Sequence, residues 1–178
     1  SGGIPSDIGN LTNLTHLYLE WNQLTGQIPI EIGNLIKLED FSIKHNEITG
    51  EIPSEIGNLT KLWGLTLRWN NLSGNIPSEI GNLVNLTEVR IDGNNLSGQV
   101  PESICDIYTN LTALLISSNN LCPPYPSCLT EDDIGTQDIS ACPVQDCAGT
   151  WGGTNFDANS DGIYGDYEAV KTISKGNS

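Results

Sequence analysis

The chain has 178 residues, of which 37% are hydrophobic and 16% charged, a composition typical of a folded soluble protein. Seven Lys and Arg against 22 Asp and Glu give a net charge of -15, which disfavours nucleic acid and anionic membrane surfaces as partners. No apolar stretch approaches the roughly 18 residues that a transmembrane helix needs. Because the sequence contains no targeting peptide, we expect any secretion signal to have been removed or to lie outside it.

The first 121 residues consist of one unit repeated five times. A glycine and a proline each return every 24 residues, at Gly2, Gly26, Gly50, Gly74 and Gly98, and at Pro5, Pro29, Pro53, Pro77 and Pro101. Each unit also carries LxxLxLxxNxL or a close variant, with its asparagine at Asn22, Asn46, Asn70, Asn94 or Asn119. The alternating apolar residues predict a short strand, and a unit this small cannot bury its apolar face alone. Stacking therefore predicts one continuous core under a parallel sheet.

Together with the GxIPxxIGNL segment, these residues resemble the plant-type form of the leucine-rich repeat family over residues 1 to 121. The resemblance implies a curved solenoid with short parallel β-strands on its concave face and irregular or 3-10 turns on its convex face. The repeats would have 24, 24, 24, 24 and 25 residues. It also implies that the repeated asparagines bond to backbone groups of adjacent repeats. An unpaired buried polar group costs about 1 to 3 kcal/mol, so we predict a structural role for them.

Outward-pointing strand residues form columns across such a solenoid. We predict partner contacts in three columns, which combine the aromatic and charged residues typical of binding hot spots: Tyr18 and Arg90; Glu20, Lys44, Arg68 and Asp92; and Trp21, His45 and Trp69. Two alternatives stay open. Adjacent charges of opposite sign pair across the sheet, or each tryptophan packs over its neighbour's backbone without a ligand.

Seven sequons of the form NxS/T are candidate N-glycosylation sites: Asn10, Asn13, Asn58, Asn71, Asn85, Asn95 and Asn110. The modification requires an exposed asparagine and a secretory route. The repeat consensus itself supplies NLT and NLS, so a purely structural origin of these motifs is the alternative. We expect N-linked glycans on a secreted form of the chain.

All five cysteines lie in the last 74 residues. They form no CxxC pair and both histidines lie far upstream, which favours disulfides and an oxidising compartment over a zinc site. The segments ESICD and NNLCPPYPSC resemble the ending of secreted leucine-rich repeat proteins from aquatic microbes. This resemblance implies a Cys-rich cap over residues 122 to 147 that closes the last repeat, held by Cys105, Cys122, Cys128 and Cys142. The connectivity, and the role of Cys147, stay open.

A Gly- and Asp-rich segment follows over residues 148 to 178. Its residues 157 to 168, DANSDGIYGDYE, match DxNxDGxxxxxE and resemble the calcium loop of an EF-hand. The resemblance implies one Ca²⁺ held by Asp157, Asn159, Asp161, the backbone carbonyl of Ile163, and Glu168. A Gly-rich stretch stands in place of the entering helix, so an acidic turn without a metal is the alternative.

No residue pattern predicts an enzyme, since neither His16 nor His45 has a nucleophile in an arrangement that the sequence supports. We predict a non-enzymatic extracellular protein. In the sequence, no repeat precedes the first one, and open strand edges rarely stay bare. Either the chain continues upstream, or the edge stays bare, or another copy's C-terminal segment covers it, which predicts head-to-tail assembly into a filament or layer. The alternative function is a receptor-like or adhesive ectodomain that binds a protein or glycan on its concave face.

Overall fold

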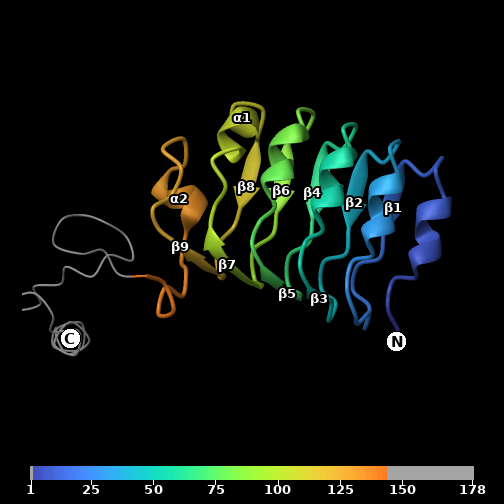
Figure 1. Cartoon of the computed structure of the whole chain (residues 1–178), viewed down its shortest axis with the longest axis horizontal. Helices are drawn as coiled ribbons and strands as arrows, with labels where there is room; N and C mark the ends of the chain where they lie inside the picture. Colours follow the sequence, from blue (N-terminus) through green and yellow to red (C-terminus); the bar gives the residue numbers. More distant parts are fainter. Residues whose placement is uncertain (1, 144–178) are drawn as a thin grey trace, which may run out of the picture. The chain divides into compact units, whose positions relative to one another are not determined.

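The computed structural model describes residues 2–143, and the repeats stack side by side along the chain (Figure 1). The segment up to Ala141 belongs to one compact unit. Each repeat contributes one strand to a main sheet and one short helix to the opposite side. The predicted leucine-rich repeat solenoid is confirmed.

The main sheet contains one strand from each repeat, paired in parallel in chain order: β1 (His16–Tyr18), β2 (Asp40–Ser42), β4 (Gly64–Thr66), β6 (Glu88–Arg90) and β8 (Ala113–Leu115). In the register, Leu17, Phe41, Leu65, Val89 and Leu114 form one buried row. Because side chains alternate along a strand, the residues on either side of each row member point outward. We call this outer side the strand face; it is the surface predicted to be concave.

A second sheet lies at another side of the stack and was not predicted from the sequence. It pairs β3 (Thr49–Gly50), β5 (Asn71–Gly74), β7 (Asn95–Gln99) and β9 (Asn120–Cys122) in parallel. The segment after each repeated asparagine runs extended, and its backbone bonds to the preceding repeat, as from Asn71 N–H to the Ile48 carbonyl at 2.8 Å. These bonds satisfy backbone groups that would otherwise need water.

The opposite side carries the 3-10 helices η1 (Ser6–Asn10), η2 (Ile30–Asn34), η3 (Ser54–Asn58) and η4 (Ser78–Asn82), followed by α1 (Ile104–Tyr108). Each 3-10 helix follows a proline in extended conformation. Adjacent repeats meet closely here, since a Cβ added to Gly33 would lie 2.7 Å from both the Cβ and the backbone oxygen of Glu55. We call this side, over η1 to η4, the helix face.

The core is one continuous cluster of leucine, isoleucine, valine and phenylalanine side chains between the two faces. In the second and third repeats these side chains are fully buried, among them Leu38, Phe41, Ile43, Leu62, Leu65 and Leu67. In the first repeat, Leu14, Leu19 and Leu24 are only partly buried. Stacking therefore provides the burial that one repeat lacks.

Four of the five repeated asparagines connect adjacent repeats, as predicted. The prediction is wrong for Asn22, which bonds only to the Leu19 and Glu20 carbonyls of its own turn because no repeat precedes it in the sequence. The Asn70 amide donates to the carbonyls of Ile43 and Leu67, both at 3.0 Å, while its Oδ1 accepts from the Ile48 N–H at 3.1 Å. The same pattern recurs at Asn46, Asn94 and Asn119. Each amide thus satisfies backbone groups of two repeats at once.

The C-terminal cap contains a residue that takes the asparagine role for the last repeat. Gln137 donates to the Ile116 carbonyl at 2.9 Å and accepts from the Leu121 N–H at 3.2 Å. It lies just after α2 (Glu131–Ile134), whose start is capped by Thr130. The cap therefore continues the hydrogen-bond pattern of the repeats beyond residue 121.

A disulfide joins Cys105 on α1 to Cys128 in the cap, and Cys122 and Cys142 are also disulfide-bonded. Cys147 and the predicted calcium residues Asp157, Asn159, Asp161, Ile163 and Glu168 lie outside the described residues. No helix in the part of the chain that the structure describes is long and apolar enough to span a bilayer.

Candidate binding surface on the strand face

The three predicted columns lie on the strand face or at the turn that follows its strands. Tyr18, Trp21 and Trp69 are 55%, 70% and 47% exposed, which makes them available for contact. Asp92 is only 5% exposed. The structure thus brings most of the predicted contact residues to one surface and buries one of them.

The rings of the third column form a stack. The centroids of Trp21 and His45 lie 3.6 Å apart with the rings 12° from parallel, and those of His45 and Trp69 lie 6.2 Å apart at 11°. The ring of Trp69 covers Gly93, where an added Cβ would lie 2.8 Å from a ring carbon. Trp69 therefore packs over its neighbour's backbone, as in the alternative considered above, whereas Trp21 stacks on the ring of His45, and both tryptophans stay exposed.

All three aromatic residues adopt the left-handed backbone conformation, with φ of 55° at Trp21 and 56° at His45 and Trp69. Such φ values are uncommon for residues other than glycine. The turn places each ring beside the ring or backbone of the next repeat. The sequence does not reveal this conformation, because only Gly93 in the same column carries the usual signal.

The charges of the second column pair across the sheet, which is the alternative considered above. Lys44 contacts Glu20 at 3.2 Å, and Arg68 contacts Asp92 at 3.1 Å. The guanidinium of Arg68 also lies 6.0 Å from the Trp69 ring centre. The side chains of Lys44 and Arg68 stay 32% and 30% exposed, so the pairing orients these cations without removing them from the surface.

Sequence reasoning missed a fourth column, at the first position of each strand: His16, Asp40, Gly64, Glu88 and Ala113. The Tyr18 hydroxyl donates to Asp40 at 2.6 Å. The same two residues line a depression of about 370 Å³, together with Glu20, Ser42, Lys44, Trp63, Thr66 and Glu88. The glycine at the first position of β4, Gly64, was the signal that could have indicated this depression.

The bond to Asp40 raises the pKa of the Tyr18 phenol to about 12, with burial and the charges of Asp40 and Glu20 adding to the effect. The carboxylate stabilises the protonated phenol, so ionisation needs a higher pH than the ordinary value near 10. We predict that Asp40→Asn lowers the pKa of Tyr18 toward that value. Ultraviolet difference titration against the Tyr18→Phe variant isolates this one phenol, and an unchanged titration in Asp40→Asn would contradict the contact.

The seven sequon asparagines are all exposed, and none lies on the strand face. Asn10 and Asn58 end helices of the helix face, and Asn71 and Asn95 begin strands of the second sheet. The remaining three, Asn13, Asn85 and Asn110, lie in the turns that precede main-sheet strands. Glycans at these positions would leave the strand face uncovered.

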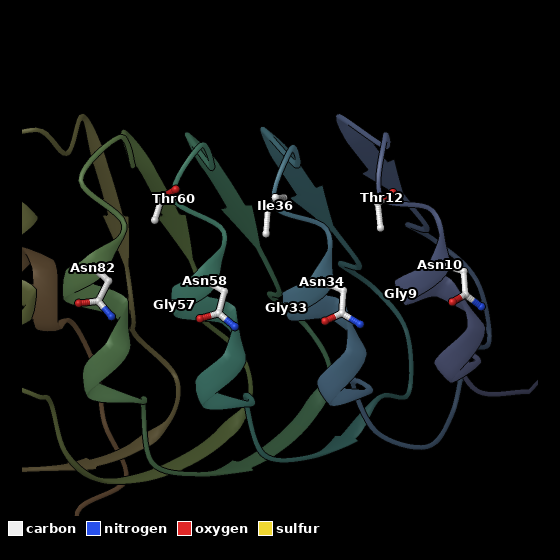
Figure 2. Close-up of a pocket in the computed structure, with 10 residues that line it drawn as sticks. All are labelled: Gly9, Asn10, Thr12, Gly33, Asn34, Ile36, Gly57, Asn58, Thr60 and Asn82. Atoms are coloured by element: carbon white, nitrogen blue, oxygen red, sulfur yellow. The ribbon is translucent and has the colours of Figure 1, made fainter.

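The helix face carries a trough of about 940 Å³ with a repeating pattern of side chains, shown in Figure 2. Asn10, Asn34, Asn58 and Asn82 form one row across the helices, and Thr12, Ile36 and Thr60 form a second row beside it. Among the described residues, the amides of Asn34, Asn58 and Asn82 have no hydrogen-bond partner in the protein. The trough therefore presents a free amide in each of three successive repeats, whereas the Asn10 amide donates to Asp7 at 3.3 Å.

Comparison with known proteins supports the repeat assignment. A leucine-rich repeat region model matches residues 4–91, and a leucine-rich repeat model matches residues 85–107. A search of curated proteins found no significant match to the sequence.

The plant peptide hormone receptor RGFR1, in complex with RGF2, superposes with a TM-score of 0.70 at 40% identity over 71% of this chain and 20% of the receptor chain. The ectodomain of the Arabidopsis receptor kinase HAESA was solved in complex with an N-terminally extended IDA peptide hormone. It superposes with a TM-score of 0.68 at 35% identity, over 78% of this chain and 24% of the receptor chain. A plant ice-binding protein superposes with a TM-score of 0.63 at 31% sequence identity, over 68% of this chain and 39% of the ice-binding protein chain.

The chain thus spans a fifth to a quarter of the length of these two receptor chains. The two repeat models together match more than half of this chain, from residue 4 to residue 107. With the strand register, the asparagine bonds and the second sheet, they establish that the chain belongs to the leucine-rich repeat family, in its plant-type form.

Proposed function

We propose that the strand face binds an extended peptide, or an exposed segment of another extracellular protein. The observation that carries this proposal is the gathering of exposed aromatic rings and oriented cations on one continuous sheet surface: Tyr18, Trp21, Lys44, Arg68 and Trp69. Tryptophan, tyrosine and arginine contribute most of the binding energy at protein interfaces.

The guanidinium of Arg68 keeps much of its binding capacity despite its ion pair. It has five N–H donors, and its contact with Asp92 is made by one terminal nitrogen. The carboxylate fixes the side chain before a ligand arrives, which lowers the entropy lost on binding. A peptide carbonyl or carboxylate on the strand face would find these donors already oriented.

Two further observations support an extracellular peptide-binding role. The similar HAESA ectodomain was solved with an IDA peptide hormone ligand, and the similar peptide hormone receptor RGFR1 with RGF2. None of the sequon asparagines lies on the strand face, so glycans on an extracellular form of the chain would not cover a ligand there. Both points favour an extracellular interaction module.

A random peptide display library, selected on the immobilised full chain, tests the proposal. We expect the enriched peptides to lose at least tenfold in affinity for a Trp21→Ala/Trp69→Ala variant, because hot-spot aromatics contribute about 2 kcal/mol or more each. The matched control is Leu11→Ala/Val84→Ala, which removes two apolar side chains, 52% and 59% exposed, away from the strand face. Equal affinity for both variants would overturn the proposal.

Ice binding is a second candidate function, favoured by the side-chain rows on the helix face (Figure 2). The free amides of Asn34, Asn58 and Asn82 recur once per repeat, and a regular row of this kind can order water. The similar plant ice-binding protein supports this candidate. Ice recrystallisation assays test it: inhibition by the wild type that is lost in Thr12→Asp/Thr60→Asp supports it, and no inhibition by the wild type rejects it.

Ca²⁺ binding by residues 157–168 stays a proposal that rests on the sequence pattern alone. Calorimetry with Ca²⁺ tests it, and heats unchanged in Asp157→Ala and Glu168→Gln would reject it. Head-to-tail self-assembly also stays a prediction from the sequence, and light scattering that finds monomers at high concentration with Ca²⁺ present would reject it.

A further inference from the structure

The depression on the strand face is built around a missing side chain. Asp40, Gly64 and Glu88 are in register on the adjacent strands β2, β4 and β6. Since Gly64 has no side chain, the carboxylate of Asp40 leans into the free space: a Cβ added to Gly64 would lie 2.6 Å from its Oδ1. Gly64 therefore both opens the depression and allows a carboxylate to lie across it.

The charge of Asp40 is the uncompensated one among the three carboxylates that line the depression. The other two form ion pairs of 3.2 Å each, Glu20 with Lys44 and Glu88 with Arg90. Within the described residues Asp40 has no ion pair. The depression thus carries an unpaired negative charge, on a protein whose net charge is already -15.

The carboxylate of Asp40 also has hydrogen-bonding capacity left. Tyr18 donates to Oδ2 of Asp40, and in the described part of the chain Oδ1 has no hydrogen-bond donor. This oxygen can therefore accept a hydrogen bond from a ligand.

Two aromatic rings line the same depression as this acceptor. Tyr18 and Trp63 line the depression, and Trp63 is 39% exposed. The negative π-face of such a ring attracts a cation and packs well against a methylene chain. A depression lined by an unpaired carboxylate and two aromatic rings is therefore complementary to a long side chain that ends in a positive charge.

We propose that this depression binds the lysine or arginine side chain of a ligand that lies along the strand face, an inference that rests on the proposed function. The cation bonds to Oδ1 of Asp40, and its methylene stem packs between Tyr18 and Trp63. The acidic protein steers such a ligand toward the surface. A metal ion does not fit as well, since the described residues contain no group of three or more His, Cys, Asp or Glu side chains able to hold one.

The test uses a probe that needs no peptide partner. N-acetyl-arginine amide is titrated into the ¹⁵N-labelled full chain, with N-acetyl-citrulline amide as the uncharged probe of nearly the same shape. We expect the arginine probe to shift the Gly64 amide and Trp63 indole signals and to bind at least tenfold more tightly than the citrulline probe. Equal binding of the two probes, or shifts confined to other residues, would overturn the inference.

Two variants locate the interaction. Asp40→Asn keeps the shape of the side chain, and we expect it to weaken the arginine probe about tenfold, whereas Asp7→Asn on η1 leaves the affinity unchanged. Gly64→Ala displaces only the carboxylate end of Asp40, so it should fold normally and still weaken the probe. Full binding by both Asp40→Asn and Gly64→Ala would contradict the assignment.

The outcomes separate this inference from the proposed function. If the arginine probe binds at Gly64 but no library peptide is enriched, cation binding by the depression is supported and the peptide-binding function is rejected. If enriched peptides bind the strand face while the arginine and citrulline probes behave alike, the function stands and the depression does not select a cation.

Discussion

Replacing Asn70 by alanine is expected to lower the free energy of unfolding by about 3 kcal/mol or more. The side chain is 8% exposed, and its loss leaves the carbonyls of Ile43 and Leu67 and the N–H of Ile48 without their amide partner. Each buried backbone group left unpaired costs about 1 to 3 kcal/mol. Urea denaturation followed by circular dichroism measures the change.

The first repeat supplies the matched control. Asn22 is exposed and bonds only to carbonyls of its own turn, those of Leu19 and Glu20, so water can replace its amide. We expect Asn22→Ala to cost less than about 1 kcal/mol. In Asn70→Asp an oxygen would face two carbonyls, so this variant should be as unstable as Asn70→Ala. Similar costs for Asn22→Ala and Asn70→Ala would contradict the bridging role.

Removing the Cys105–Cys128 disulfide is expected to lower stability by about 3 kcal/mol, because the bond closes a loop of moderate length in the unfolded chain. Its two cysteines are 23 positions apart in the sequence and join α1 to the cap that carries Gln137. In the double variant Cys105→Ser/Cys128→Ser, the cap should therefore unfold before the repeats do.

Hydrogen exchange distinguishes this local effect from a general one. In the double variant we expect the Leu121 N–H, which donates to Gln137, to exchange faster at once, while the Asp40 to Thr66 region of the main sheet keeps its protection until global unfolding. A free energy of unfolding within about 0.5 kcal/mol of the wild type would show that the bond does not hold the cap.

The repeat period made most of the fold predictable from the sequence. The spacing of Leu17, Phe41 and Leu65 predicted the strand register, and the family resemblance predicted backbone bonds to adjacent repeats for the asparagines, which holds for all of them except Asn22. The second sheet was missed, because backbone bonds between extended segments depend little on side-chain type. Gln137 was missed because it replaces an asparagine outside the repeat frame, where no periodic signal marks it.

The binding surface was only partly predictable. Periodicity identified the columns of Trp21, Lys44 and Arg68, but it does not say which charges pair or which rings stack. The depression at Gly64 depends on an absent side chain and on the direction in which Asp40 leans, and both follow from the register of two strands. Such features depend on residues that are neighbours only in the folded structure, and the glycine is the one sign of them in the sequence.

Hydroxyl-radical footprinting of the full chain with a library-selected peptide tests the central claim, binding at the strand face, most directly. The radicals oxidise exposed aromatic and aliphatic side chains, and both faces carry suitable reporters. The proposal predicts that the peptide protects Tyr18, Trp21, Trp63 and Trp69 while Ile36 and Val84 react as before. Protection of Ile36 and Val84 with the four aromatic residues unchanged would contradict it.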